Sequence, residues 1–212
     1  MAVDIREFIN PTETAIIITE CQEAVIGENS PLKGLLQVVQ ESRMLEHLAA
    51  LLEVARRVKV KIFHATVERR DDGFGDPLNT PLTRMMAKHG GASSGLAPGS
   101  AGAQIVKILG PAPEDIVLPR LHGMTSFHET GLDHFLRNTG VKNVIVTGVS
   151  LNIAVTSAVI EAVNRGYNVV VAKDCVAADP PEYGEAVFKY TLRNLCYLTD
   201  SATIQTIWKE SF

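Results

Sequence analysis

The stretch Thr147-Gly148-Val149-Ser150-Leu151-Asn152-Ile153-Ala154-Val155 decides the fold of this chain. It has the pattern of a buried strand that ends in a tight turn and continues as the first turn of a helix. An α/β enzyme places a nucleophile at such a junction, where the helix N-terminus favours a thiolate over a thiol. Ala154 stands where we expect that thiol. The stretch therefore predicts an α/β fold whose chemistry depends on other residues.

Apolar runs and amphipathic patterns alternate along the rest of the chain. Ala15-Ile16-Ile17-Ile18-Thr19 is a short apolar, β-branched run, as in a strand buried on both faces of a parallel sheet. Strands that alternate with helices imply right-handed crossovers and a mostly parallel sheet with helices on both faces. The strands are predicted at 15–19, 58–65, 115–118, 142–147, 167–172 and 195–198, and the helices at 44–58, 131–138, 152–165, 181–193 and 202–209.

One segment, 71–102, interrupts this alternation. It is rich in Gly and Pro, and a loop of this length inside a compact domain is usually a lid, a partner-binding arm or a disordered segment. Met85 and Met86 indicate a short helix within it. We predict a single domain over residues 1–212, with 71–102 as a lid or a subunit contact.

Composition excludes several classes of function. The chain has 212 residues, of which 46% are hydrophobic, a formal net charge of −4 and no clustered Lys or Arg, so we expect no nucleic-acid partner. Cys21, Cys175 and Cys196 are odd in number and far apart, which predicts neither disulfides nor a zinc site and favours a reducing cytoplasm. The N-terminal residues do not resemble a secretory signal, and no apolar run approaches the length of a membrane span, so we expect no membrane partner.

Several segments in register resemble the isochorismatase-like hydrolases, a superfamily of cysteine hydrolases that includes nicotinamidases and N-carbamoylsarcosine amidohydrolases. Residues 15–22 resemble that family's first strand, which ends in an aspartate, a hydrophobic residue and Gln. Residues 125–132 resemble its Ser-Ala-Phe…Thr-x-Leu segment, and residues 148–155 resemble its Gly-Val-Ala-Thr-Asn-Ile-Cys-Val nucleophile segment. Residues 161–167 and Asp174 follow at the family's spacing.

The resemblance implies a three-layer α/β/α sandwich with a six-stranded, mostly parallel, Rossmann-like sheet in the order 3-2-1-4-5-6. In that order strands 1 and 4 are neighbours whose crossovers leave in opposite directions. Their carboxyl ends then flank the crevice in which open α/β sheets bind ligands. Glu20 ends strand 1, and residues 149–154 follow strand 4. Both are therefore expected at one site.

The resemblance also implies an Asp-Lys-Cys triad, from which this chain departs at every position. Glu20 stands at the aspartate position and is one methylene longer. The lysine position falls on Leu121 without a gap, or on Arg120 with one inserted residue. Ala154 stands at the cysteine position and cannot attack an amide carbon. We therefore predict a degenerate triad in which residue 154 supports no covalent mechanism.

Two features of the family's site are expected to remain in this chain, a carboxylate at the end of strand 1 and a cis peptide bond in the turn after strand 4. The family's cis peptide bond is expected at Val149–Ser150, where it aims backbone N–H groups into the pocket as an anion site. We interpret Glu20 as a general acid or base, because true isochorismatases resemble this case in lacking the cysteine and using the strand-1 acid. In the alternative interpretation, Glu20 caps a neighbouring helix or pairs with Arg120.

Further candidates surround these groups. Arg120 is predicted to be catalytic, and Arg120 and His122 either bind a carboxylate or form a surface pair. His64 stands where nicotinamidases carry metal ligands, but one histidine without a second at ligand spacing predicts no metal, and we expect no cofactor. The predicted substrate-binding residues are His64, His122, Phe127, Val149, Ser150 and Ala154.

These observations predict a hydrolase that acts without a covalent intermediate on a small polar or carboxylate-bearing molecule, with Glu20 as general acid or base. The first alternative is a non-catalytic protein that binds a small molecule in the same pocket. The second is an amidase that uses Cys21 or Cys175 as a non-standard nucleophile. The resemblance further implies a homo-oligomer, a dimer or a tetramer, and we place the protein in the cytoplasm.

Overall fold

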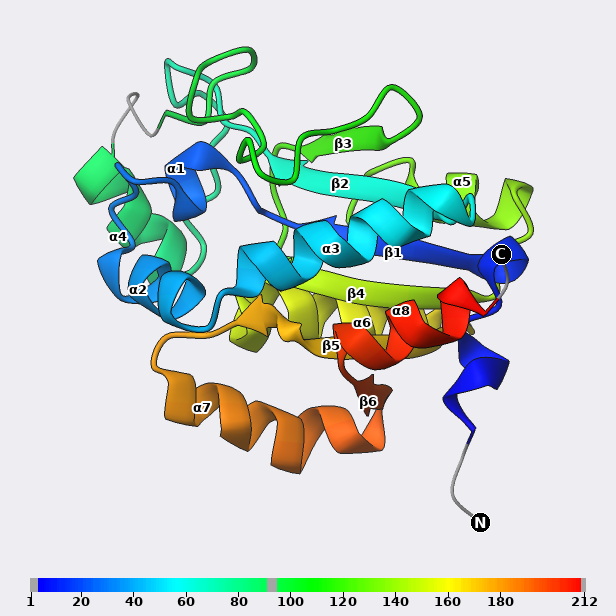
Figure 1. The fold of residues 1–212 in the computed structure, drawn as a ribbon. Coiled ribbons are helices and arrows are strands. Elements are labelled where there is room, and N and C mark those ends of the chain that lie inside the picture. Colours follow the sequence, from blue (N-terminus) through cyan, green and yellow to red (C-terminus); the bar gives the residue numbers. More distant parts are fainter. Residues whose placement is uncertain (1–3, 91–94, 211–212) are drawn as a thin grey trace.

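The computed structural model describes residues 4–90 and 95–210 and is organised around one six-stranded sheet (Figure 1). Neighbouring strands are all parallel and follow the order β3-β2-β1-β4-β5-β6, which confirms the predicted topology. The strands are β1 (Thr14–Thr19), β2 (Lys61–Val67), β3 (Ile116–Arg120), β4 (Asn143–Val149), β5 (Asn168–Ala177) and β6 (Tyr197–Thr199).

Helices cover both faces of the sheet, as predicted (Figure 1). Successive residues of β1 point to opposite faces, so Ile16 and Ile18 belong to one buried cluster and Ala15 and Ile17 to the other. The first cluster lies under α1 (Glu23–Ile26), α2 (Lys33–Glu41), α3 (Met44–Arg57) and α8 (Ser201–Lys209). The second lies under α5 (Leu132–Asn138), α6 (Thr156–Asn164) and the turns that follow α7 (Pro181–Ala186). Single turns of 3₁₀ or π geometry occupy Ile5–Phe8, Pro11–Glu13, Leu151–Val155, Val187–Thr191 and Leu192–Asn194.

Strand β5 runs five residues beyond its predicted end. The charged pair Lys173-Asp174 interrupts the apolar pattern, which is why the sequence placed the end at residue 172. The strand continues through a register shift against β4. The Asp174 carboxylate is satisfied there, because it accepts hydrogen bonds from the backbone N and Oγ of Ser201 at 2.8 and 2.6 Å. A long-range contact therefore overrides the local pattern.

The segment 71–102 contains a helix where its two methionines indicated one. Helix α4 spans Pro81–Gly90, and residues 91–94 of the segment lie outside the described residues. Helix α2 was not predicted, because its start carries no capping signal in the sequence. Its N-cap residue is Leu32, whose side chain makes no capping hydrogen bond. Leu35 and Val39, buried one turn apart, are the signal that could have found it. None of the helices in the described part of the chain is long and apolar enough to cross a lipid bilayer.

The end of β4 requires a glycine at position 148. Gly148 has a φ of +95°, and a Cβ there would lie 2.2 Å from the backbone oxygen of Thr19 in β1. Only glycine allows the two strands to approach so closely in this conformation. This approach brings the residue that follows β1 next to the turn that follows β4.

Replacing Gly148 with Ala is expected to lower the free energy of unfolding by at least about 2 kcal/mol, because backbone strain adds to overpacking. Gly166 provides the matched control, since its φ is +87° and a Cβ added there would have nothing within 4 Å of it. Gly166→Ala should therefore lower the free energy of unfolding only by the backbone strain, which is about 1 kcal/mol. Urea unfolding of both variants measures the difference. Equal losses would contradict the close approach at Thr19.

Candidate functional site

A cavity of about 640 Å³ lies at the carboxyl ends of β1 and β4. Its walls include Glu20, which follows β1, and Arg120, the last residue of β3. Ser150 and Ala154, from the turn after β4, line the same cavity. The structure thus brings together four of the predicted site residues. The position agrees with the crevice expected at the switch between β1 and β4.

Glu20 is held by both its backbone and its side chain. Its φ is +52°, and its backbone N donates to the Ala65 oxygen of β2 at 2.9 Å. Its carboxylate forms an ion pair with the Arg120 guanidinium, whose side chain is 5% exposed, against 20% for Glu20. Arg120 Nε also donates to the Gly123 oxygen at 3.2 Å. The predicted alternative that Glu20 pairs with Arg120 is therefore confirmed as an ion pair. Both residues of the pair line the cavity.

Two buried polar atoms in the cavity wall have no hydrogen-bond partner among the described residues. They are Arg120 Nη1, a donor, and Asn152 Oδ1, an acceptor. An unpaired buried polar group costs free energy, and most such groups in native proteins have a partner. The two atoms lack a hydrogen-bond acceptor and a donor respectively, and an amide or ureido group carries both.

The turn after β4 has an unusual backbone, as predicted. The Val149–Ser150 peptide bond is cis, and Thr19 Oγ1 lies 3.0 Å from the Val149 oxygen. The Ser150 oxygen accepts hydrogen bonds from Ile153 N at 3.2 Å and Val155 N at 3.1 Å, which widens the first helical turn. Ala154 lies in this turn and is 4% exposed. Val149 itself is fully buried in the core, so its side chain takes no part in the cavity wall.

His64 was predicted at the pocket edge, but the structure places it elsewhere. It lies in the middle of β2, three residues before the strand ends, and is 1% exposed. Its Nε2 is 3.3 Å from Asp115 Oδ2, and Arg56 Nη2 donates to the same oxygen at 2.6 Å. Burial alone would raise the pKa of Asp115, but the hydrogen bonds from His64 and Arg56 outweigh it and lower that pKa to about 2. His64 belongs to a buried ionic network beneath α3.

Phe127 and His122 also lie outside the cavity wall. Phe127 is 3% exposed and packs in the core below α5 and α6, 6.3 Å from the Tyr167 ring. It lies in a loop and not in a strand, so the alternation of side chains along a strand could not predict where its ring points. His122 pairs with Glu129 at 3.3 Å on the outer side of the loop after β3. Their predicted contact with substrate is not supported by these positions.

The same loop holds a group of potential metal ligands. The ligand atoms of His122, His128 and Glu129 all lie within 4.8 Å of one another, and the three side chains are half-buried or exposed. Two imidazoles and a carboxylate suit zinc and similar divalent ions. These residues do not line the cavity, so they contribute no group to the chemistry considered there.

The cysteines offer no accessible thiolate. Burial raises the pKa of Cys21, and the charge of the neighbouring Glu20 raises it further. Burial likewise raises the pKa of Cys175 well above its ordinary value and that of the half-buried Cys196 to about 12. A nucleophilic cysteine needs the opposite shift. The geometry therefore argues against the alternative in which Cys21 or Cys175 is the nucleophile.

Several cavity residues were missed by sequence reasoning. Lys33 and Gly34 come from α2, and Asp179 follows β5. A Cβ on Gly34 would lie 2.1 Å from Asp179 Oδ2, so the helix and the loop after β5 close one wall together. Arg69, which follows β2, completes the charged part of the lining. None of these residues belongs to a motif, so only the tertiary structure identifies them.

Comparisons with known proteins agree with the fold. The isochorismatase domain model matches residues 14–203. Ureidoacrylate amidohydrolase RutB of Pseudomonas syringae pv. syringae is 25% identical over 187 residues, which cover 84% of this chain and 76% of that protein. The crystal structure of a cysteine hydrolase from Pseudomonas syringae pv. phaseolicola has a TM-score of 0.77 at 23% identity and covers 100% of both chains. N-carbamoylsarcosine amidase from Thermoplasma acidophilum has a TM-score of 0.70 at 20% identity, over 89% of this chain and 96% of its own. These two structural matches establish a shared fold.

Proposed function

Because this chain belongs to the isochorismatase-like hydrolase family, we propose that it hydrolyses a small amide-type or ureido substrate without a covalent intermediate. Glu20 acts as the general acid and base in this proposal. The observation that carries it is the shared cavity, into which the Glu20–Arg120 pair and the turn that holds Ala154 both open. A carboxylate is retained there, while alanine occupies the position at which the triad places its thiol.

The proposed reaction uses a water molecule as nucleophile. In its ion pair with Arg120, Glu20 is a carboxylate and accepts a proton from water through Oε. The water oxygen forms a bond to the substrate carbonyl carbon, and the carbonyl electron pair moves to its oxygen. Backbone N–H groups of the turn at 150–154 stabilise that oxyanion. The carbon–nitrogen bond then breaks, and the proton passes from Glu20 to the leaving nitrogen. The carbonyl re-forms as that bond breaks. An amide gives a carboxylic acid and an amine or ammonia, and a ureido compound gives a carbamic acid and an amine or ammonia.

Three observations support this substrate class. Arg120 Nη1 and Asn152 Oδ1 call for an acceptor and a donor in the ligand. Lys33 adds positive charge to the wall and suits a substrate that also carries a carboxylate. Relatives of this chain are named for hydrolysis of a ureido compound and of an N-carbamoyl amino acid.

A non-catalytic binding protein is the second candidate. It is favoured by Ala154, because the family's thiol chemistry is unavailable in a chain with a methyl group at that position. It is also consistent with a Glu20 carboxylate that is already occupied by Arg120. In this candidate the cavity binds the same class of ligand but releases it unchanged.

A ligand screen paired with product detection separates the two candidates. The probes are ureidoacrylate, N-carbamoylsarcosine and primary alkyl amides, scored by the shift in melting temperature and by ammonia release. A probe that raises the melting temperature should also be hydrolysed, because binding places its carbonyl beside Glu20. Stabilisation by several probes with no product from any of them would overturn the hydrolase proposal and leave the binding protein.

A further inference from the structure

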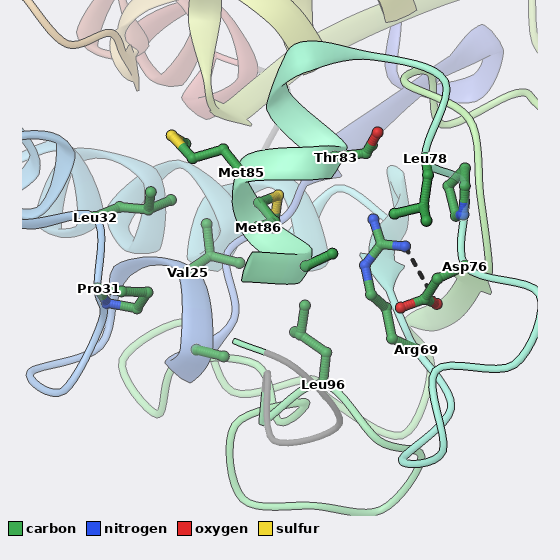
Figure 2. A pocket seen from close by; sticks show the side chains of 13 residues that line it. Val25, Pro31, Leu32, Arg69, Asp76, Leu78, Thr83, Met85, Met86 and Leu96 are labelled. Carbon is green, nitrogen blue, oxygen red and sulfur yellow. Dashed lines mark hydrogen bonds and ion pairs between the residues drawn. The ribbon is translucent and has the colours of Figure 1, made fainter. Parts of the chain in front are cut away.

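A second cavity opens beside the first, beneath α4. It has a volume of about 300 Å³ and is lined mainly by Val25, Leu32, Leu78, Met85, Met86 and Leu96 (Figure 2). We refer to this second cavity as the annex. Its polar residues are Thr83 and the ion pair of Arg69 with Asp76, whose Nη1 and Oδ1 lie 3.5 Å apart. Figure 2 shows the apolar side chains gathered around α4, with the Arg69–Asp76 pair to one side.

The annex and the larger cavity adjoin each other, because most of the residues that line the annex also line the larger cavity. The shared residues are Val25, Pro31, Leu32, Arg69, Thr83, Met85, Met86 and Leu96. The remaining residues divide by chemistry. Glu20, Arg120 and the turn after β4 line only the larger cavity. The residues that line only the annex are Ala24, Pro77, Leu78 and Ala87, together with Asp76, which pairs with Arg69. A ligand that enters the larger cavity therefore meets polar groups at one end and an apolar compartment at the other.

The annex suits an apolar group better than water. Water in a protein cavity needs two to four polar partners, and the polar side chains of the annex are only Thr83 and the Arg69–Asp76 pair, which lies to one side (Figure 2). Methionine side chains adapt their shape to irregular apolar ligands. Leu78 is 47% exposed and Met85 46% exposed, so apolar surface at the rim remains available for burial. A contiguous exposed apolar surface marks a binding site more often than single apolar side chains scattered over the surface do.

We propose that the annex binds the apolar tail of the substrate. The substrate class is then an amide or ureido compound whose head meets Glu20 and Arg120 and whose alkyl or aryl chain extends beneath α4. The inference rests on the proposed function for the identity of the head group. For the tail, it rests on the residues that line both cavities. The tail takes no part in the catalytic step.

Calorimetric titration with primary straight-chain amides, from acetamide to octanamide, tests the annex directly. The dissociation constant should fall about fourfold per added methylene, equivalent to about 0.8 kcal/mol, until the annex is filled. Ammonia release is measured on the same samples. Affinity that rises with chain length while no amide is hydrolysed would support the annex and count against the hydrolase. The two proposals therefore fail separately.

Two neighbouring substitutions provide the matched comparison. Ala87 lines the annex and not the larger cavity, whereas the adjacent Lys88 lines neither. Ala87→Phe should weaken octanamide binding at least about tenfold and leave acetamide binding within about twofold, because it fills space that only the tail needs. Lys88→Phe adds the same ring to the same helix and should leave the whole series unchanged.

Equal affinity along the series, or no binding of octanamide to the native protein, would overturn the inference. So would an equal effect of the two Phe substitutions.

Discussion

Glu20→Gln is expected to lower kcat/KM at least about 100-fold, the usual contribution of a general acid or base. The amide nitrogen cannot accept the proton of the attacking water, and the shape of the side chain is otherwise kept. The measurement is steady-state hydrolysis of the best amide or ureido substrate from the screen. A binding role for Glu20 alone would raise KM and leave kcat unchanged.

The substitution also removes the partner of a buried guanidinium. Arg120 is 5% exposed and would lose its ion pair, so a lower melting temperature is expected and the assay is run well below it. Glu129→Gln is the matched control, because Glu129 pairs with His122 on the surface outside the cavity. It should retain full activity. Full activity in Glu20→Gln, with Glu129→Gln also active, would refute the catalytic role.

Ala154→Cys is expected to create a reactive thiol where the native chain has none. Ala154 faces the cavity from the first turn of a helix, and such positions lower the pKa of a thiol. Iodoacetamide should label residue 154 at least about tenfold faster than any native cysteine, since the thiolate fraction at pH 7 rises steeply with that shift. Peptide mass spectrometry locates the label.

Ala158→Cys provides the matched control. It lies one turn further along the same helix, is fully buried in the core under α6, and lines no part of the cavity. A thiol there should stay unlabelled in the folded protein. Labelling of Ala158→Cys at the rate of Ala154→Cys would show that the reagent reaches the core through unfolding. No labelling of Ala154→Cys would mean that this position does not open into the cavity.

Much of the fold was predictable from local pattern. Apolar β-branched runs such as residues 15–19 and 143–149 can be buried only as central strands of a sheet covered on both faces, and the helices between them impose the parallel order. The strand order was implied by the family resemblance, and in that order the carboxyl ends of β1 and β4 meet at the switch point, where a site is expected. Glu20 and the turn after β4 were predictable on this basis.

Side-chain direction outside regular strands was not predictable in the same way. Phe127 lies in a loop segment whose path depends on packing below α5 and α6, and it points into the core. His64 lies in a strand, but the strand extends further than its apolar pattern, so the residue is central rather than terminal. Its buried partner Asp115 is 51 residues away in the chain.

Hydrophobic periodicity in the amino-acid sequence determined a mostly parallel sheet with helices on both faces, and residue type determined the chemistry that residue 154 lacks. The order of the strands was implied by the family resemblance of the sequence motifs. Only the tertiary structure decided that Arg120 meets Glu20 across 100 residues, and that α2 and α4 close the cavity and its annex. The physical reason is that periodicity reports the burial of one element at a time. The site depends instead on which distant side chains are desolvated together, and that is set by packing.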